Sequence, residues 1–133
     1  MKPLILTVDD ERQITDLIRL CLEEAGYEVA CASSSREALD VIRDRRPNLI
    51  LLDLMLPDVD GLSFFEILRS GRSTATIPVA ILTGWSTDEA RKYGAELGAV
   101  AYLNKPLTRD VLLEHVGQIL GPRPRAKAKR AAK

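Results

Sequence analysis

The chain has 133 residues, of which 46% are hydrophobic and 29% charged, values typical of one globular domain with its own core. It has no apolar run long enough to span a membrane, and its N-terminal apolar stretch is too short for a signal peptide. Two cysteines and one histidine supply neither a disulfide framework nor a zinc site, so the composition predicts a reduced, cytoplasmic protein without membrane partners.

The net charge of zero conceals an uneven distribution of charge. All 19 acidic residues lie within residues 1–120, whereas six of the 19 basic residues follow Gly121, so residues 1–120 carry a net charge of −6. An acidic body is not typical of a nucleic-acid-binding domain. Residues 121–133 contain no acid and no apolar face, which predicts a disordered basic tail and disfavours nucleic acid as a partner. The predicted division is a domain over residues 1–120 and a tail over 121–133.

Strand and helix patterns alternate along the domain. Short apolar runs bounded by turn residues predict five strands, over Leu4–Val8, Tyr27–Ala32, Leu49–Leu52, Ile77–Leu82 and Val100–Leu103. Apolar residues at helical spacing predict a helix after each strand, from Ile14 to Ala25, from Ser34 to Ile42, from Gly61 to about Ser70, from Ser86 to Leu97 and from Thr108 to Ile119. Side-chain caps are expected at the starts of three helices, at Ser34, Ser86 and Thr108.

Five strand–helix units in succession predict an α/β fold with a doubly wound parallel sheet and helices on both of its faces. In such sheets, ligands bind beyond the carboxyl ends of the strands, at the topological switch point. The candidate functional residues are therefore those that finish strands, namely Asp9, Asp10, Asp53, Thr83 and Lys105.

Three carboxylates, one hydroxyl and one ammonium group are thus expected at one edge of the sheet. Each residue alone has an ordinary explanation as a helix cap or a solvated side chain. Together, Asp9, Asp10 and Asp53 repel one another, which raises their affinity for a hard divalent cation such as Mg²⁺. A carboxylate beside Mg²⁺ can attack a phosphoryl group, whose oxygens a lysine and a hydroxyl can bind.

Four motifs lie at these strand ends, namely VDDE (Val8–Glu11), LLDLMLPDVDG (Leu51–Gly61), AILTG (Ala80–Gly84) and YLNKP (Tyr102–Pro106). They resemble the motifs of the receiver domains of two-component response regulators. The resemblance covers essentially residues 4–120, and the four motifs in this order are specific. It implies the flavodoxin-like strand order 2-1-3-4-5 with five helices, and a phosphorylation-dependent switch rather than a turnover enzyme.

The resemblance also implies how phosphorylation and metal binding are shared among the acids. Asp53 is the expected phosphoacceptor, with a sensor histidine kinase, a histidine phosphotransfer protein or a small phosphodonor as the source. Mg²⁺ is expected on Asp10, Asp53 and the backbone carbonyl of Met55, while Asp9 acts through a bound water.

Residues at the remaining strand ends are expected to bind the phosphoryl group and to couple its binding to a conformational change. Thr83 and Lys105 would contact the phosphoryl oxygens, and Gly84 would leave them room. The peptide bond from Lys105 to Pro106 is expected to be cis. Tyr102 is the expected switch aromatic, which moves inward as Thr83 is drawn to the phosphate and so changes the face that binds a downstream protein.

The loop after the phosphoacceptor and the rim of the site carry further expectations. Pro57 and Gly61 are expected to shape that loop. Met55 and Trp85 are large, flank the path of an attacking water, and cannot act as its base. They are therefore predicted to exclude water and prolong the phosphorylated state.

Two other classes of protein share parts of this pattern. A haloacid-dehalogenase-type phosphatase also uses an aspartyl-phosphate, but its nucleophile lies on the first strand with a second Asp two residues later, whereas Asp9 and Asp10 are adjacent. A flavodoxin-like cofactor binder would place a phosphate after the first strand, where the acids would repel it. A stand-alone regulator is expected, with a receiver domain of a longer regulator that has a separate effector domain as the alternative.

Overall fold

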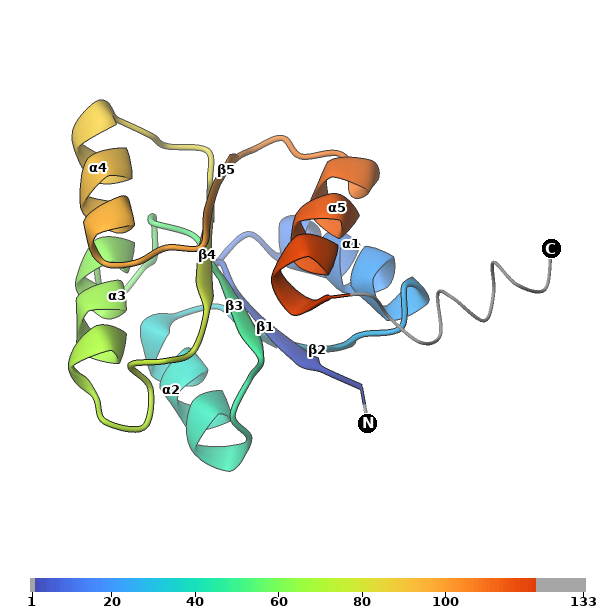
Figure 1. Cartoon of the computed structure of the whole chain (residues 1–133), viewed down its shortest axis with the longest axis horizontal. Helices are drawn as coiled ribbons and strands as arrows, with labels where there is room; N and C mark the ends of the chain where they lie inside the picture. Colours follow the sequence, from blue (N-terminus) through green and yellow to red (C-terminus); the bar gives the residue numbers. More distant parts are fainter. Residues whose placement is uncertain (1, 122–133) are drawn as a thin grey trace, which may run out of the picture.

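The computed structural model describes residues 2–121, in which strands and helices alternate (Figure 1). The strands are β1 (Leu4–Val8), β2 (Glu28–Ala32), β3 (Leu49–Leu52), β4 (Val79–Thr83) and β5 (Ala101–Asn104). The helices are α1 (Arg12–Glu24), α2 (Ser35–Asp44), α3 (Gly61–Ser70), α4 (Asp88–Glu96) and α5 (Arg109–Leu120).

All five strands pair in parallel to form one sheet with the order β2-β1-β3-β4-β5. The register aligns the strand ends, because Val8 of β1 lies opposite both Ala32 of β2 and Leu52 of β3. The predicted fold class and strand order are confirmed. The order reverses between β1 and β3, which is where the chemistry-bearing strand ends were expected to meet.

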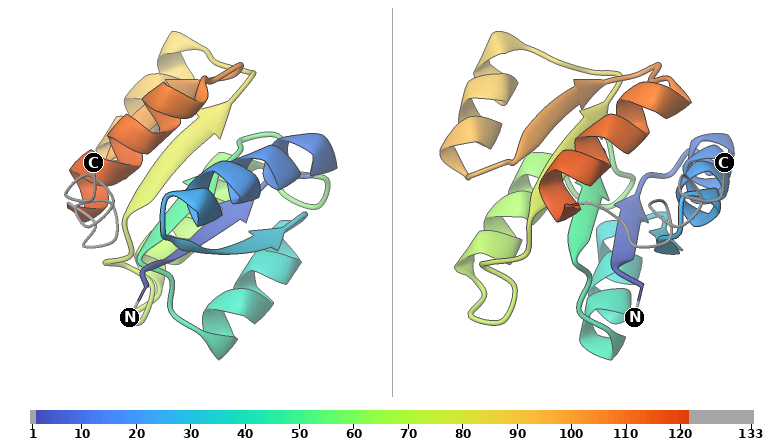
Figure 2. Two further views of the ribbon diagram at one scale, coloured as in Figure 1. Left: turned by 90° about the vertical axis from the view of Figure 1, so that its right-hand side faces the viewer. Right: turned by 45° about the vertical axis from the view of Figure 1, so that its right-hand side comes forward.

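Two helical layers cover the sheet and build a core on each of its faces. Helices α2, α3 and α4 lie on one face, and α1 and α5 lie on the other (Figures 1 and 2). On the first face, Phe64 and Phe65 of α3 pack against the sheet, whereas on the second face Leu22 of α1 and Val116 of α5 do so. Because β1, β3 and β4 are covered on both faces, every residue of these strands is buried, which explains their continuous apolar runs.

The boundaries of several elements differ from the sequence prediction. Strand β4 begins at Val79 rather than Ile77, because the intervening Pro78 has no N–H to give to the sheet. The expected cap at Ser86 is wrong: Thr87 is the N-cap of α4, and its hydroxyl accepts a hydrogen bond from Ala90 N at 3.0 Å. The caps expected at Ser34 and Thr108 are present.

No helix within residues 2–121 combines the length and the apolar character that crossing a membrane requires. Helix α5 ends at Leu120, and its C-cap Gly121 has a φ of 83°, in the left-handed region that glycine adopts readily. The predicted basic tail lies outside the described residues from position 122 onward.

Candidate functional site

The parallel sheet brings the predicted site residues to one edge. Backbone hydrogen bonds fix the strand ends there, since Asp53 N donates to Val8 O at 2.9 Å and Lys105 N donates to Thr83 O at 2.9 Å. The carboxyl ends of four strands therefore supply the site. The residues concerned are Asp9 and Asp10 after β1, Asp53 after β3, Thr83 at the end of β4 and Lys105 after β5.

Three carboxylates form a cluster at this edge. One oxygen from each of Asp9, Asp10 and Asp53 lies within 4.8 Å of the others. Asp9 and Asp53 are each only 4% exposed, whereas Asp10 is exposed to solvent. Clustered carboxylate oxygens are the donor type that Mg²⁺ prefers, so the residues present fit the predicted metal.

Lys105 supplies the positive charge that compensates these acids. Its Nζ lies 2.6 Å from Asp9 Oδ2, 2.9 Å from Glu11 Oε1 and 3.2 Å from Asp53 Oδ2. Burial alone would lower the pKa of Lys105, but the hydrogen bonds to Asp9 and Glu11 and the charge of Asp53 outweigh it and raise that pKa above its ordinary value. The ammonium group therefore stays charged at neutral pH.

Local turns orient the other polar groups. The carboxylate of Asp53 accepts a hydrogen bond from Met55 N at 3.3 Å, and the hydroxyl of Thr83 accepts one from Trp85 N at 3.2 Å. Met55 and Trp85 are 57% and 45% exposed. Both predicted rim residues thus follow their polar neighbours by two positions and lie at the surface.

Gly61 and Gly84 differ in how much space surrounds them. A Cβ added to Gly61 would lie 2.5 Å from the backbone oxygen of Asp53 and 2.5 Å from Leu54 Cα, closer than real contacts allow. A Cβ on Gly84 would meet only the Lys105 side chain, at 4.0 Å. Packing therefore requires glycine at Gly61, while the role of Gly84 in leaving room for a phosphoryl group stays a prediction.

Asp58 anchors the loop between β3 and α3, a role that the sequence did not reveal. Its carboxylate accepts hydrogen bonds from the Ser35 hydroxyl at 2.7 Å, from Ser35 N at 3.1 Å and from Arg36 N at 3.2 Å, at the start of α2. The hydroxyl contact is the main cause that holds the pKa of Asp58 at about 2. No local sequence signal could have linked Asp58 to a helix start 23 residues away.

Tyr102 lies on β5, opposite Ile81 of β4. Its hydroxyl is buried without a hydrogen-bond partner among the described residues, and the Arg91 guanidinium of α4 lies 4.5 Å from the centre of its ring. A buried hydroxyl that lacks a partner gains if its surroundings rearrange. The inward movement predicted for Tyr102 remains a prediction.

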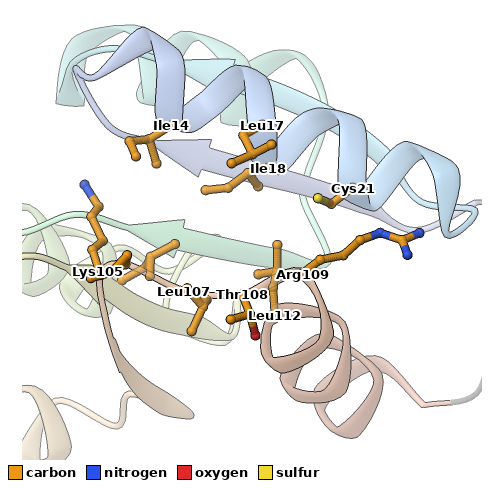
Figure 3. A pocket seen from close by; sticks show the side chains of 11 residues that line it. Ile14, Leu17, Ile18, Cys21, Lys105, Leu107, Thr108, Arg109 and Leu112 are labelled. Carbon is orange, nitrogen blue, oxygen red and sulfur yellow. The ribbon is translucent and has the colours of Figure 1, made fainter.

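An apolar groove adjoins the polar site. The Lys105–Pro106 peptide bond is cis, as predicted, and the segment after it leads from β5 into α5 (Figure 1). Figure 3 shows the groove between these two helices, where Leu107 and Leu112 face Ile18 across a volume of about 180 Å³. Leu17 of α1 lines this groove and is exposed to solvent.

A doubly wound sheet, with an acid cluster at its switch point whose charge a lysine offsets, is the arrangement of a receiver domain. Residues 5–117 match the family model of the response regulator receiver domain, and the chain belongs to this family. The chain is 39% identical over 116 residues to the phosphate regulon transcriptional regulatory protein PhoB of Pseudomonas aeruginosa. This match covers 87% of the chain and 51% of PhoB, so the chain spans about half the length of that relative.

Solved structures show the same likeness. A CheY-like response regulator receiver domain protein from Methanospirillum hungatei is 33% identical, with a TM-score of 0.84 over 90% of this chain and 94% of that one. The chemotaxis protein CheY4 of Vibrio cholerae is 29% identical, with a TM-score of 0.83 over 90% of this chain and 99% of that one. These findings place the chain in the predicted family rather than among haloacid-dehalogenase-type phosphatases or flavodoxin-like cofactor binders.

Proposed function

We propose that this receiver domain is a phosphorylation-dependent switch, with Asp53 as the phosphoacceptor. The observation that carries the proposal is the position of Asp53, which is buried among two other carboxylates and has the Lys105 ammonium 3.2 Å away. In the proposed transfer, an Asp53 oxygen attacks the phosphorus of a phosphohistidine on a sensor kinase or a phosphotransfer protein. The P–N bond breaks, its electron pair returns to the imidazole, and Asp53 becomes an acyl phosphate.

The proposed cofactor is Mg²⁺, held by Asp10, Asp53 and the backbone carbonyl of Met55, with Asp9 acting through a water. When bound, it offsets the negative charge that gathers on phosphoryl oxygens. The clustering of three carboxylates supports this assignment, because their mutual repulsion falls when a cation binds.

Lys105 and Thr83 are proposed to bind the oxygens of the transferred group. The Lys105 ammonium already lies within hydrogen-bond distance of Asp53, so it is placed to bind what becomes attached there. The Thr83 hydroxyl sits at the end of β4 and is buried, and its single described partner is a backbone N–H that leaves its own proton free to donate.

The proposed output is a protein-binding face formed by α4, β5 and α5. Thr83 and Tyr102 lie on adjacent strands, and Tyr102 contacts the Arg91 side chain of α4, so a shift of Thr83 toward a phosphate has a short route to this face. Phosphorylation supplies new charge-assisted contacts that favour an alternative conformation.

Incubation with acetyl phosphate and Mg²⁺ tests the switch. We expect one phosphoryl group to be added, detected by mass spectrometry, and amide chemical shifts to change along α4, β5 and α5 as well as at the site. Shifts confined to residues around Asp53 would contradict the coupling to the output face. A failure to phosphorylate the folded, Mg²⁺-loaded protein would contradict the proposed function.

Met55 and Trp85 are proposed to lengthen the lifetime of the phosphorylated state by keeping water away from the acyl phosphate. Replacing Met55 with Asn and Trp85 with Glu in one variant gives smaller or polar groups that admit and orient water. We expect dephosphorylation to accelerate severalfold, measured as loss of label after the phosphodonor is removed. Ile67→Asn is a matched control, since Ile67 is an exposed apolar residue of α3. An unchanged lifetime in the double variant would show that Met55 and Trp85 do not protect the acyl phosphate from water.

The proposed switch domain spans residues 1–120, with residues 121–133 as a tail, and works in the cytoplasm. It acts either alone or within a longer regulator that has a separate effector domain. The name of PhoB describes that protein as a transcriptional regulatory protein. A pull-down that compares phosphorylated with unphosphorylated protein would identify the downstream target in either case.

A further inference from the structure

Glu11 is the third acid of the motif after β1, and the proposed site gives it no role. It is the N-cap residue of α1, yet its side chain makes no capping hydrogen bond to that helix. Instead, Glu11 Oε1 lies 2.9 Å from Lys105 Nζ, across 94 positions of sequence. Its backbone holds it in place, because Glu11 N donates to Asp9 Oδ1 at 2.9 Å.

The contact with Glu11 gives the ammonium group of Lys105 a third carboxylate partner. A lysine ammonium has three N–H donors and no acceptor. In the structure it contacts three carboxylates, those of Asp9, Asp53 and Glu11, at 2.6, 3.2 and 2.9 Å. A phosphoryl oxygen at Asp53 therefore competes with these three carboxylates for the ammonium group of Lys105.

Of these partners, Glu11 is the one that can leave at the lowest cost. Asp9 is buried at 4% exposure, so water cannot solvate its carboxylate if the ammonium moves away, and only the proposed Mg²⁺ would remain to compensate its charge. Asp53 is the residue that becomes phosphorylated, so it is not a partner that leaves. The Glu11 side chain is 60% exposed, and water can solvate its carboxylate as soon as it moves away.

We infer that Glu11 is a positioning residue that occupies Lys105 in the unphosphorylated state and is displaced by the phosphoryl group. This inference rests on the proposed function of Asp53 and Lys105. Glu11 holds the ammonium over the acid cluster while the site is empty of phosphate, and it opposes phosphorylation because its carboxylate and the phosphoryl oxygens compete for the same donor. The residue thus biases the switch toward its unphosphorylated form.

The test measures how tightly the site binds a phosphoryl analogue when this competitor is removed. Beryllium fluoride serves as the probe at saturating Mg²⁺, and the fluorescence of Trp85, the only tryptophan in the chain, reports binding. Glu11→Ala should lower the apparent dissociation constant about threefold, the size expected for releasing an exposed ion pair. The fold should persist in this variant, because the Glu11 side chain makes no capping contact.

Two further variants separate a specific contact from a general effect of charge. Glu11→Asp keeps the charge but withdraws the carboxylate by one C–C bond, about 1.5 Å, and should also tighten binding. Glu23→Ala removes an exposed acid elsewhere on α1 and should leave binding unchanged. If Glu11→Asp behaves like the unaltered protein, or if Glu23→Ala matches Glu11→Ala, competition for Lys105 is wrong.

Binding of beryllium fluoride to the unaltered protein tests the proposed function itself. If it fails to bind beryllium fluoride with Mg²⁺, the proposed phosphorylation site itself is contradicted. If it binds and Glu11→Ala gives the same dissociation constant, the proposed function stands and the role of Glu11 is rejected.

Discussion

Asp53→Asn is expected to abolish phosphorylation by acetyl phosphate. The amide nitrogen and oxygen of Asn keep the shape of the side chain, but the amide is a far weaker nucleophile than a carboxylate. Asp9 is equally buried and also lies beside Lys105, but it is proposed to act on Mg²⁺ through a water, so we do not expect it to replace Asp53 as the nucleophile. The added phosphoryl group should therefore disappear from the mass spectrum of the variant.

Asp10→Asn separates the metal from the nucleophile in the same assay. Asp10 is exposed and makes no ion pair with Lys105, so its replacement removes a proposed Mg²⁺ ligand while the contacts of the buried acids remain. We expect Mg²⁺ binding, followed by Trp85 fluorescence, to weaken at least tenfold and phosphorylation to fall with it.

Asp40→Asn is the control for both substitutions, since Asp40 lies exposed on α2 and, within residues 2–121, forms an ion pair with Arg43 alone. It should bind Mg²⁺ and accept one phosphoryl group as the unaltered protein does. Full-rate labelling of Asp53→Asn would show that another residue is the acceptor. Unchanged Mg²⁺ binding by Asp10→Asn would reject Asp10 as a ligand.

Gly61→Ala is expected to give the largest loss of stability among small substitutions near the site. The new Cβ would lie 2.5 Å from two backbone atoms of the Asp53–Leu54 segment, neither of which can rotate away as a side chain does. The backbone must shift to relieve the overlap, at a cost of about 2–3 kcal/mol in the free energy of unfolding. Because that segment carries Asp53, phosphorylation should slow as well.

Gly117→Ala is the matched control, because a Cβ at this position of α5 meets no atom of residues 2–121 within 4 Å. Alanine is the better helix former, so this variant should gain about 0.5–1 kcal/mol. Urea unfolding followed by circular dichroism measures both changes. If the two alanine variants have equal stabilities, the close approach at Gly61 does not constrain the loop.

The positions of the strands and of most site residues follow from local features of the sequence. A strand buried on both faces must be continuously apolar, so Leu49–Leu52 stands out without any structure. A parallel sheet aligns the carboxyl ends of its strands, so polar residues directly after such runs converge once the alternation with helices is recognised. The acid cluster with Lys105 was predictable for this reason.

Helix starts were less predictable, because neighbouring residues offer equivalent caps. Ser86 and Thr87 both carry a hydroxyl three positions before a suitable backbone N–H, and sequence favoured Ser86 because Glu89 completes a capping box. In the structure Thr87 has the extended backbone of an N-cap, with φ −128° and ψ 161°, and its hydroxyl makes the bond. The path of the chain out of β4 decides between them, and that path depends on packing.

The contacts that connect the loops of the site arise only in the tertiary structure. The bonds from Asp58 to the start of α2 and from Glu11 to Lys105 join residues 22 to 94 positions apart. Periodicity and capping signals act over about one helical turn, so they carry no information on which loops will meet. Likewise, the constraint on Gly61 comes from the backbone of Asp53 and Leu54, which the tertiary structure places beside it. It does not come from the backbone conformation of Gly61 itself. Long-range proximity of this kind is set by how the crossovers pack on the sheet, and side-chain reach then determines which charges pair.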